Sequence, residues 1–323
     1  MDSITKRHLT EQELSRIVCA ACGGHVAITG QDYNNDGWFN SIYTLSLSNG
    51  ENIVVKIFPL ADIPIMRYEQ GIMTVEVEVM RRLHGDKIVP VPEILFHDPA
   101  GELVGSEVYV MEKLAGRSYA GRRGEFSPEQ QELIDTEMGR LCRRMNDIHD
   151  SAFGYYADGG RRAATWPEGF AIFVDDLLAD AHDKDVPLPL PAGDLRGLML
   201  APEGRYDDVT TPSLVHWDLH DGNVFVDDDG RITGLLDFER AIWADPLMEF
   251  NFGALFYRDA FNRGYGFDGL QTAQQRYRRI VYDVYLDLVM VVEAYYRCYD
   301  DPKHREWTRG MLDRDLGRLK ELA

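Results

Sequence analysis

The chain has 323 residues, of which 45% are hydrophobic and 27% charged, and its mean hydropathy is −0.31. This composition excludes an intrinsically disordered chain and an integral membrane protein. The net charge of −20 disfavours binding to nucleic acids or to anionic membranes. Because the first 17 residues contain no apolar leader, we expect a cytoplasmic protein.

The first 113 residues carry the pattern of a small sheet. A helix is predicted over residues 10–24, with Thr10 as its N-cap. The hydrophobic period then changes to two on either side of Asn49-Gly50, which is a strong hairpin signal. The predicted strands are 42–48, 52–58, 93–97 and 107–112, and a second helix is predicted over 67–84.

Beyond Gly116 the pattern is mostly helical. Ser127 is an evident N-cap for a long amphipathic helix. The predicted helices are 128–150, 167–182 and several after 248, and the predicted short strands are 214–216, 224–226 and 232–236. The sequence therefore predicts an α+β, bilobal protein with a small β-rich lobe (1–113) and a larger helical lobe (114–323).

Two cysteines have a spacing that can mark zinc or redox chemistry. Cys19 and Cys22 form a CxxC pair, but they lie in the first predicted helix and no second pair follows. We therefore interpret them as buried small residues without a metal.

The segment LVHWDLHDGNVFVDDDGRITGLLD carries the most informative polar residues. A strand, a loop and a hairpin should bring Asp218, Asn223 and Asp237 to one rim. Phosphoryl transfer needs a carboxylate that orients the acceptor hydroxyl and hard oxygen ligands for Mg²⁺. A zinc site built from His216, His220 and nearby aspartates is the alternative, but alternate side chains of an extended segment diverge.

A lysine lies in the apolar predicted strand IVVKIF. A charge at this position, Lys56, is costly unless it is paired or bound to a ligand. Glu76, twenty residues later on the next predicted helix, is the expected partner, and its spacing from Leu83 favours it over Glu78. A lysine held by a glutamate is the phosphate anchor of kinases.

Together these residues resemble the aminoglycoside phosphotransferase family, which consists of small-molecule kinases with a protein-kinase-like fold. The resemblance implies Asp218 as catalytic base, Asn223 and Asp237 as Mg²⁺ ligands, and Lys56 as phosphate anchor fixed by Glu76. The segments VPVPEILFHD, YVMEKLAG and LLDFERAIWADPLMEF are also typical of that family.

The resemblance also implies how the nucleotide is held. The backbone of Glu112 and Leu114 would contact the adenine of ATP, with GTP as an alternative nucleotide. The 34–41 loop, which ends at Ser41, would cover the phosphates, although it has a single glycine. His216 is expected to brace the catalytic loop.

Departures from the protein-kinase pattern bear on the substrate. Trp217 replaces the arginine of the HRD motif, and Asp237 begins DFE in place of DFG. No APE segment follows, so protein substrates are disfavoured. The alternative from another class is a nucleotide-binding pseudokinase that acts through a protein partner.

The acceptor is expected to be a hydroxyl group on a small polar molecule. The family implies an aminoglycoside-like antibiotic, an amino sugar, a sugar or an amino alcohol, so antibiotic resistance and metabolism stay open. Net acidity mildly favours a cationic acceptor. Glu239, next to Asp237, and two aspartates on the 167–182 helix, Asp175 and Asp176, are its candidate contacts.

Overall fold

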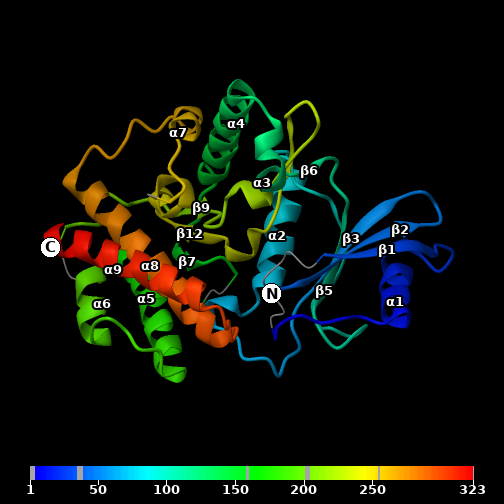
Figure 1. Cartoon of the computed structure of the whole chain (residues 1–323), viewed down its shortest axis with the longest axis horizontal. Helices are drawn as coiled ribbons and strands as arrows, with labels where there is room; N and C mark the ends of the chain where they lie inside the picture. The colour runs from blue at the N-terminus through cyan, green and yellow to red at the C-terminus, as the bar shows by residue number, and fades with distance from the viewer. Residues whose placement is uncertain (1–3, 35–38, 158–159, 201–203, 254, 323) are drawn as a thin grey trace.

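The computed structural model describes residues 4–34, 39–157, 160–200, 204–253 and 255–322. Figure 1 shows a sheet-rich lobe formed by the N-terminal part of the chain and a larger helical lobe formed by the rest. The predicted α+β, bilobal fold is confirmed.

The sheet of the small lobe has five antiparallel strands in the order β1-β2-β3-β5-β4. Its strands are β1 (Ile28–Asn34), β2 (Ser41–Leu47), β3 (Asn52–Ile57), β4 (Ile94–Asp98) and β5 (Val108–Glu112). Gly50 turns the β2–β3 hairpin with a φ of +89°, a left-handed value that glycine adopts without strain. The hairpin predicted from Asn49-Gly50 is therefore confirmed.

Helix α1 (Glu11–Cys22) packs on the outer face of this sheet, where Leu14 and Ile17 join a small hydrophobic core. The side chain of Thr10 accepts the Glu13 N–H in a capping box, as its sequence position predicts. The expectation that these cysteines are buried was wrong, because Cys19 is exposed and Cys22 is only partly buried. The buried residues of the helix are Leu14, Ile17 and Val18, and both cysteines lie outside that stripe.

Helix α2 (Ile72–Gly85) lies between the sheet and the helical lobe (Figure 1). It begins later than predicted, because Gly71 adopts a left-handed φ of +71° after a short 3₁₀ turn at Arg67–Glu69. Its buried stripe, which includes Val75, Val79 and Leu83, belongs to the same large hydrophobic core as the second lobe. The small lobe therefore has one core of its own and shares the other.

The helical lobe contains α3 (Tyr119–Arg122), α4 (Pro128–Asn146), α5 (Trp166–Asp183), α6 (Ala192–Leu200), α7 (Asp259–Tyr265), α8 (Ala273–Tyr296) and α9 (Pro302–Leu322). Two small sheets complete it. One has the order β11-β10-β6 and the other β8-β7-β12-β9. Their strands are β6 (Arg117–Ser118), β7 (Phe153–Tyr155), β8 (Arg162–Ala163), β9 (Ser213–Val215), β10 (Val224–Val226), β11 (Ile232–Leu235) and β12 (Ile242–Ala244).

Several of these elements were not predicted. Among them are strands β7, β8 and β12, which have two or three residues each. Within the described part of the chain, no helix is both long enough and apolar enough to cross a membrane.

Helices α4 and α7 approach closely through two glycines. A Cβ on Gly264 would overlap the carbonyl of Thr136, and one on Gly139 would overlap that of Phe261. Gly264→Ala should therefore lower the free energy of unfolding by about 1–3 kcal/mol, since the helices would have to separate. Urea unfolding measures the change. In the matched control Gly310→Ala, on the exposed face of α9, a Cβ meets nothing, and stability should rise by about 0.5–1 kcal/mol. Equal effects of the two substitutions would contradict this packing.

Candidate active site

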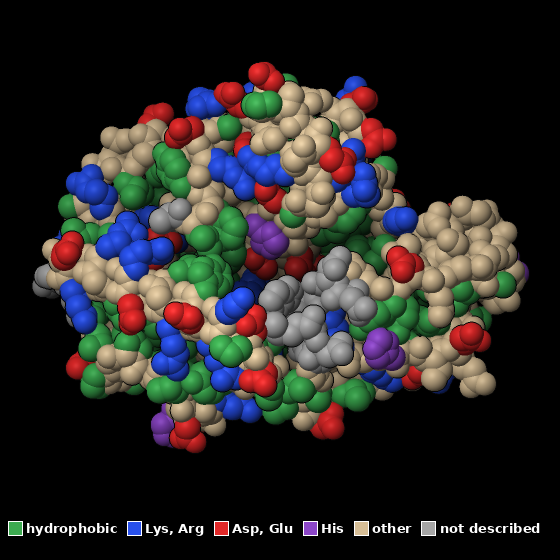
Figure 2. All heavy atoms as spheres, viewed as in Figure 1, with side chains coloured by type: hydrophobic (Ala, Val, Ile, Leu, Met, Phe, Trp, Pro, Cys, Tyr) green, Lys and Arg blue, Asp and Glu red, His purple; other side chains and the backbone are tan. Residues whose placement is uncertain are grey.

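The predicted site residues come together where the two lobes meet. β3 and α2 contribute from the small lobe, and the segments after β9 and β11 contribute from the large one. Figure 2 shows acidic side chains gathered in the hollow between the lobes.

Lys56 is at the centre of this hollow. Its Nζ lies 2.7 Å from Glu76 Oε2, 2.7 Å from Asp237 Oδ1 and 3.1 Å from Glu239 Oε2. Burial opposes the charge on Lys56, but the three carboxylates hold its pKa well above the ordinary value. The predicted Lys56–Glu76 pair is present in the structure, whereas Glu78 is exposed.

The three carboxylates around Lys56 also form a candidate cation site. One oxygen from each of Glu76, Asp237 and Glu239 lies within 4.8 Å of the others. A single ammonium does not balance three carboxylates, and burial raises the pKa of Glu76. Hard oxygen ligands of this kind suit Mg²⁺.

Asp218 follows β9 in a loop that directs its carboxylate toward the same place. Burial raises the pKa of Asp218 to about 8, Arg240 opposes this shift, and Asp237 adds to it. Arg240 Nε lies 3.8 Å from Asp218 Oδ2. Asp218 is therefore a carboxyl group that gains and loses its proton near neutral pH, as a general base must.

Asn223 and Asp237 stand on either side of the β10–β11 hairpin. Asn223 Nδ2 donates to the carbonyl oxygen of Asp218 at 2.9 Å, which leaves the amide oxygen for a cation. Asp237 adopts a left-handed φ of +67°, which is uncommon for a residue with a side chain and typical of functional loops. The structure thus brings Asp218, Asn223 and Asp237 together, as predicted from their spacing.

His216 stabilises the loop that carries Asp218. Its Nδ1 accepts the Asp218 N–H at 3.2 Å, and its Nε2 is 3.0 Å from the carbonyl oxygen of Leu236. Burial lowers the pKa of His216 to about 4, so the ring is neutral and Nε2 donates to that carbonyl. His216 is therefore a structural residue of this loop.

The fully buried Glu249 stabilises the same loop by accepting its backbone N–H groups. Its Oε1 accepts the His216 N–H at 2.9 Å and Asn146 Nδ2 at 3.0 Å, and its Oε2 accepts the Trp217 N–H at 3.1 Å. Glu249→Ala would leave the His216 and Trp217 N–H groups without acceptors, while Asn146 Nδ2 would keep only its bond to the Leu214 carbonyl oxygen. We therefore expect a loss of at least ~2 kcal/mol in the free energy of unfolding. Thermal unfolding measures it. The isosteric Glu249→Gln keeps one carbonyl acceptor and should lose less; equal losses would contradict this role.

The expected adenine contacts lie at the joint between the lobes. Glu112 ends β5, and Leu114 follows two residues later, with its side chain packed over Gly234 of β11. Among the described residues, the Leu114 N–H donates to no backbone carbonyl. An adenine edge could therefore hydrogen-bond there, and this contact stays a prediction.

The Ser41 side chain does not face the site. Ser41 is buried, its hydroxyl accepts the Arg7 N–H at 2.7 Å, and it pairs with Ile57 across β2 and β3. Side chains alternate along a strand, so Ser41 and Lys56 point to opposite faces of the sheet. The Ser41 hydroxyl is therefore not brought to Lys56, and a nucleotide contact at Ser41 stays a prediction. Half of the predicted phosphate loop, residues 35–38, lies outside the described residues.

Asn40, which precedes Ser41, does reach the site. Its Nδ2 donates to Glu239 Oε2 at 2.6 Å. Its Oδ1 is buried and has no hydrogen-bond partner among the described residues. A buried acceptor without a donor beside a carboxylate fits a place where a cation or a phosphate-bound water would sit.

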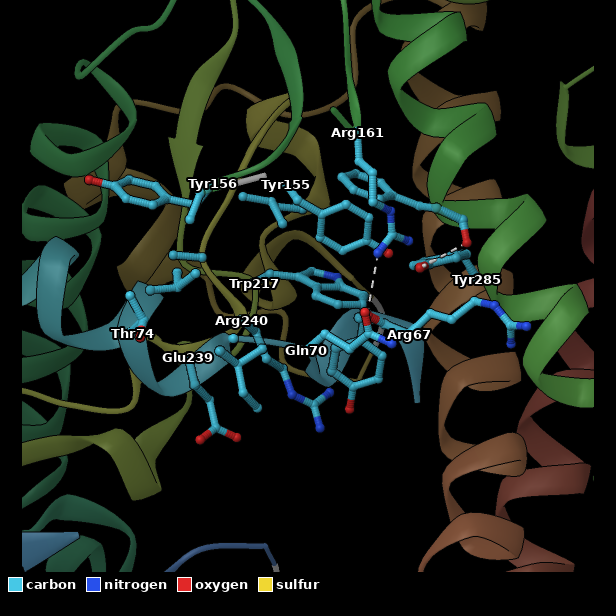
Figure 3. A pocket seen from close by; sticks show the side chains of 18 residues that line it. Arg67, Gln70, Thr74, Tyr155, Tyr156, Arg161, Trp217, Glu239, Arg240 and Tyr285 are labelled. Carbon is cyan, nitrogen blue, oxygen red and sulfur yellow. Dashed lines mark hydrogen bonds between the residues drawn. The ribbon is translucent and has the colours of Figure 1, made fainter. Parts of the chain in front are cut away.

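A cavity of about 400 Å³ opens beside the catalytic loop (Figure 3). Trp217, Glu239 and Arg240 form its side nearest Asp218, and the N-terminal end of α2 forms another side. The remaining wall comes from the β7 region, α5 and α8. Its lining residues are Arg67, Tyr68, Gln70, Gly71, Ile72, Thr74, Val75, Tyr155, Tyr156, Ala157, Arg161, Phe173, Trp217, Glu239, Arg240, Ala241, Ile242 and Tyr285.

The candidate acceptor carboxylates have different positions relative to this cavity. Glu239 lines it, but its carboxylate is bound by Lys56 and Asn40. Asp176 lies behind the lining, where it accepts the Tyr155 hydroxyl at 2.9 Å and pairs with Arg161. Asp175 is exposed and pairs with Arg196 at 2.6 Å, so it is not brought to the cavity.

Sequence reasoning assigned no role to two charged residues of the site. Arg240 lies between Asp218 and Glu293 of α8, with its Nη2 2.7 Å from Glu293 Oε1. The place of Arg240 directly after DFE was an available signal. Glu293 offered none, because it is 75 residues from Asp218 on a helix read as core.

A family model described as phosphotransferase enzyme family (APH) matches residues 33–280. Curated relatives match over shorter stretches. An uncharacterized protein of Bacillus subtilis (strain 168), YcbJ, is 47% identical over 47 residues, 14% of this chain and 15% of that protein. The acyl-CoA dehydrogenase family member 11 of Rattus norvegicus is 27% identical over 176 residues, 52% of this chain and 21% of that protein. The matches thus span about a fifth or less of these relatives.

Solved structures match over nearly the whole chain. A putative fructosamine-3-kinase from Thermobifida fusca YX-ER1 has a TM-score of 0.68 at 20% identity, covering 95% of this chain and 99% of that one. A thermostable mutant of aminoglycoside phosphotransferase APH(4)-Ia, in a ternary complex with AMP-PNP and hygromycin B, has a TM-score of 0.63 at 16% identity, with 95% and 99% covered. At these identities the likeness shows a shared fold.

Proposed function

Because the chain belongs to the APH phosphotransferase enzyme family, it is a small-molecule kinase, and we propose that it transfers the γ-phosphate of ATP, with Mg²⁺, to a hydroxyl group of an acceptor bound in the cavity. The acceptor is a sugar, an amino sugar, an amino alcohol or an aminoglycoside-like antibiotic, and the reaction takes place in the cytoplasm. GTP is the alternative donor.

The observation that carries this proposal is the convergence of the phosphate anchor with the base. Lys56, held by Glu76 at 2.7 Å, is also 2.7 Å from Asp237, which lies at the end of the hairpin that follows Asp218. Positioning and charge stabilisation supply most of the catalysis in phosphoryl transfer. Residues from β3, α2 and the catalytic loop supply both here.

Each residue then has a distinct role in the proposed reaction. Lys56 binds the phosphates, and it gives up some of its contacts with the carboxylates when the nucleotide is present. Mg²⁺, held by Asn223 and Asp237, would neutralise charge on the phosphates. Ionised Asp218 accepts the proton of the acceptor hydroxyl as the hydroxyl oxygen bonds to the γ-phosphorus, the bond from the γ-phosphorus to the β,γ-bridging oxygen breaks, and ADP leaves. Arg240 keeps the Asp218 carboxylate in place.

The test is mass spectrometry of the purified protein with ATP and Mg²⁺ against pooled sugars, amino sugars, amino alcohols and aminoglycosides, with GTP in parallel. We expect a phosphate adduct on at least one compound that is absent when Asp218→Asn replaces the native protein. Tight nucleotide binding without transfer to any pooled compound or to water would instead favour the pseudokinase alternative.

A further inference from the structure

The cavity beside Asp218 is walled mainly by aromatic rings. Six of its lining residues are aromatic, and the structure packs them against one another. Trp217 stacks on Tyr285 with ring centroids 5.5 Å apart, and Tyr155 meets Phe173 edge to face at 4.7 Å. Figure 3 shows the rings of Tyr155, Trp217 and Tyr285 turned toward the centre of the lining. Walls of this kind hold a flat or apolar molecular face.

The charged side chains of the lining are mostly cationic. Arg67, Arg161 and Arg240 contribute guanidinium groups, and Glu239 is the one carboxylate among the described lining residues. In Figure 3 the Glu239 carboxylate points away from the rings.

The carboxylates behind the lining are already paired with arginines. Asp176 pairs with Arg161, and Asp180 pairs with Arg67. Glu293 accepts from Arg240 at 2.7 Å and also pairs with Arg297. An ammonium group entering this cavity would have to displace a guanidinium from its carboxylate or stay unpaired, and an unpaired buried charge is strongly unfavourable.

Aromatic walls can also bind cations through their π faces, but here arginines of the lining already lie over three of the six rings. The Arg161 guanidinium carbon lies 4.3 Å from the centre of the Tyr155 ring. That of Arg240 lies 5.3 Å from the Tyr68 ring centre and 5.9 Å from that of Trp217. A quaternary or protonated amine would therefore meet like charge at the positions where an aromatic cage attracts it.

We propose that the acceptor is a hydroxylated compound with a flat apolar face and no positive charge, either uncharged or carrying one carboxylate. This inference rests on the proposed kinase function and departs from the cationic acceptor that net charge favours. Stacking on the rings near Trp217 holds the apolar face beside Asp218. A carboxylate, where present, binds the guanidinium edge of the cavity, where Arg240 Nη1 has no hydrogen-bond partner among the described residues.

Acceptors that share one body and differ in charge provide the test. We would titrate the protein calorimetrically with 4-nitrophenyl β-D-glucoside, the corresponding glucuronide, the corresponding 2-amino-2-deoxyglucoside, methyl β-D-glucoside and kanamycin. We expect the first two to bind at least ~10-fold more tightly than the other three. Tighter binding of kanamycin or of the amino sugar would overturn the proposal, as would no binding of any nitrophenyl probe at about 5 mM.

A separate titration with AMP-PNP and Mg²⁺ distinguishes failure of the proposed kinase function from failure of the proposed acceptor class. If AMP-PNP does not bind while the glucoside does, the proposed kinase function fails and the cavity assignment stands. If AMP-PNP binds and kanamycin is preferred over the glucoside, the kinase function stands and the acceptor class is wrong.

Two pairs of residues supply matched variants. Arg240 lines the cavity, whereas Arg162 pairs with Asp150 at 2.9 Å outside it. Arg240→Gln should weaken glucuronide binding about 10-fold relative to the glucoside, and Arg162→Gln should leave the ratio unchanged. Tyr155→Ala should weaken both nitrophenyl probes, whereas Tyr257→Ala, at an exposed tyrosine, should weaken neither. Equal effects within either pair would contradict the assignment.

Discussion

Asp218→Asn should lower kcat about 10³-fold while the affinity for nucleotide changes little. The amide keeps the size of the carboxylate, but it cannot accept the proton of the acceptor hydroxyl. Nucleotide affinity depends on Lys56 and the joint near Glu112, neither of which touches this side chain. Turnover with an acceptor found in the pooled screen, together with calorimetric binding of AMP-PNP, measures both quantities.

The pH profile separates loss of a base from loss of structure. Burial raises the pKa of Asp218 to about 8, so the wild-type kcat/KM should rise with pH up to that value as the carboxyl group ionises. The residual activity of the variant should lack this rise. Asp229→Asn, at an exposed position of the same hairpin, should keep both the rate and the profile. A variant at Asp218 that retains the rise would mean that another group is the base.

Lys56→Met should lower the free energy of unfolding by about 3–5 kcal/mol at pH 8, because it leaves three carboxylates together without their cation. Burial raises the pKa of Glu76, and without the opposing ammonium of Lys56 this carboxyl group would bind its proton still more tightly in the folded variant than in the unfolded chain. The stability of the variant should therefore recover as the pH falls from about 8 to 5. Urea unfolding across this pH range measures the change.

The matched control is Lys113→Met, at an exposed lysine of the joint. Its stability should follow that of the wild type at every pH. Mg²⁺ should stabilise the Lys56 variant more than the wild type, since a divalent ion can replace the missing ammonium among the carboxylates. A Lys56 variant as stable as the control at pH 8 would show that the three carboxylates do not depend on Lys56.

The chemistry of the site was more predictable from the sequence than its surroundings. Lys56 stands out because a charge in an apolar strand needs a partner, and Asp218, Asn223 and Asp237 stand out because a loop and a hairpin fix their separation. These are local patterns. The structure keeps these patterns because they depend on short segments of the chain, namely β3 and the stretch from β9 to β11 with the residues that follow each strand.

The cavity could not be read in the same way. Its walls come from six separate segments, and residues such as Tyr155 and Tyr285 have no local pattern that distinguishes them from ordinary core residues. The same limit explains why the sequence did not show that Ser41 faces away from Lys56 and that Asp175 lies outside the cavity. Ser41 lies in a strand whose facing depends on register, and Asp175 lies on a helix face whose orientation depends on tertiary packing.

The shared core and the contacts of α8 bear on how the protein unfolds and evolves. Helix α2 buries its apolar stripe among side chains of the second lobe, and Arg297, the C-cap residue of α8, binds Glu69, just before α2, at 2.6 Å. The two halves on either side of the joint at Glu112 thus share a hydrophobic core and a buried ion pair. We therefore expect one cooperative unfolding transition. A chimaera that exchanged lobes with a relative at this joint would need the matching α8 as well, so substrate specificity and nucleotide handling should be inherited together.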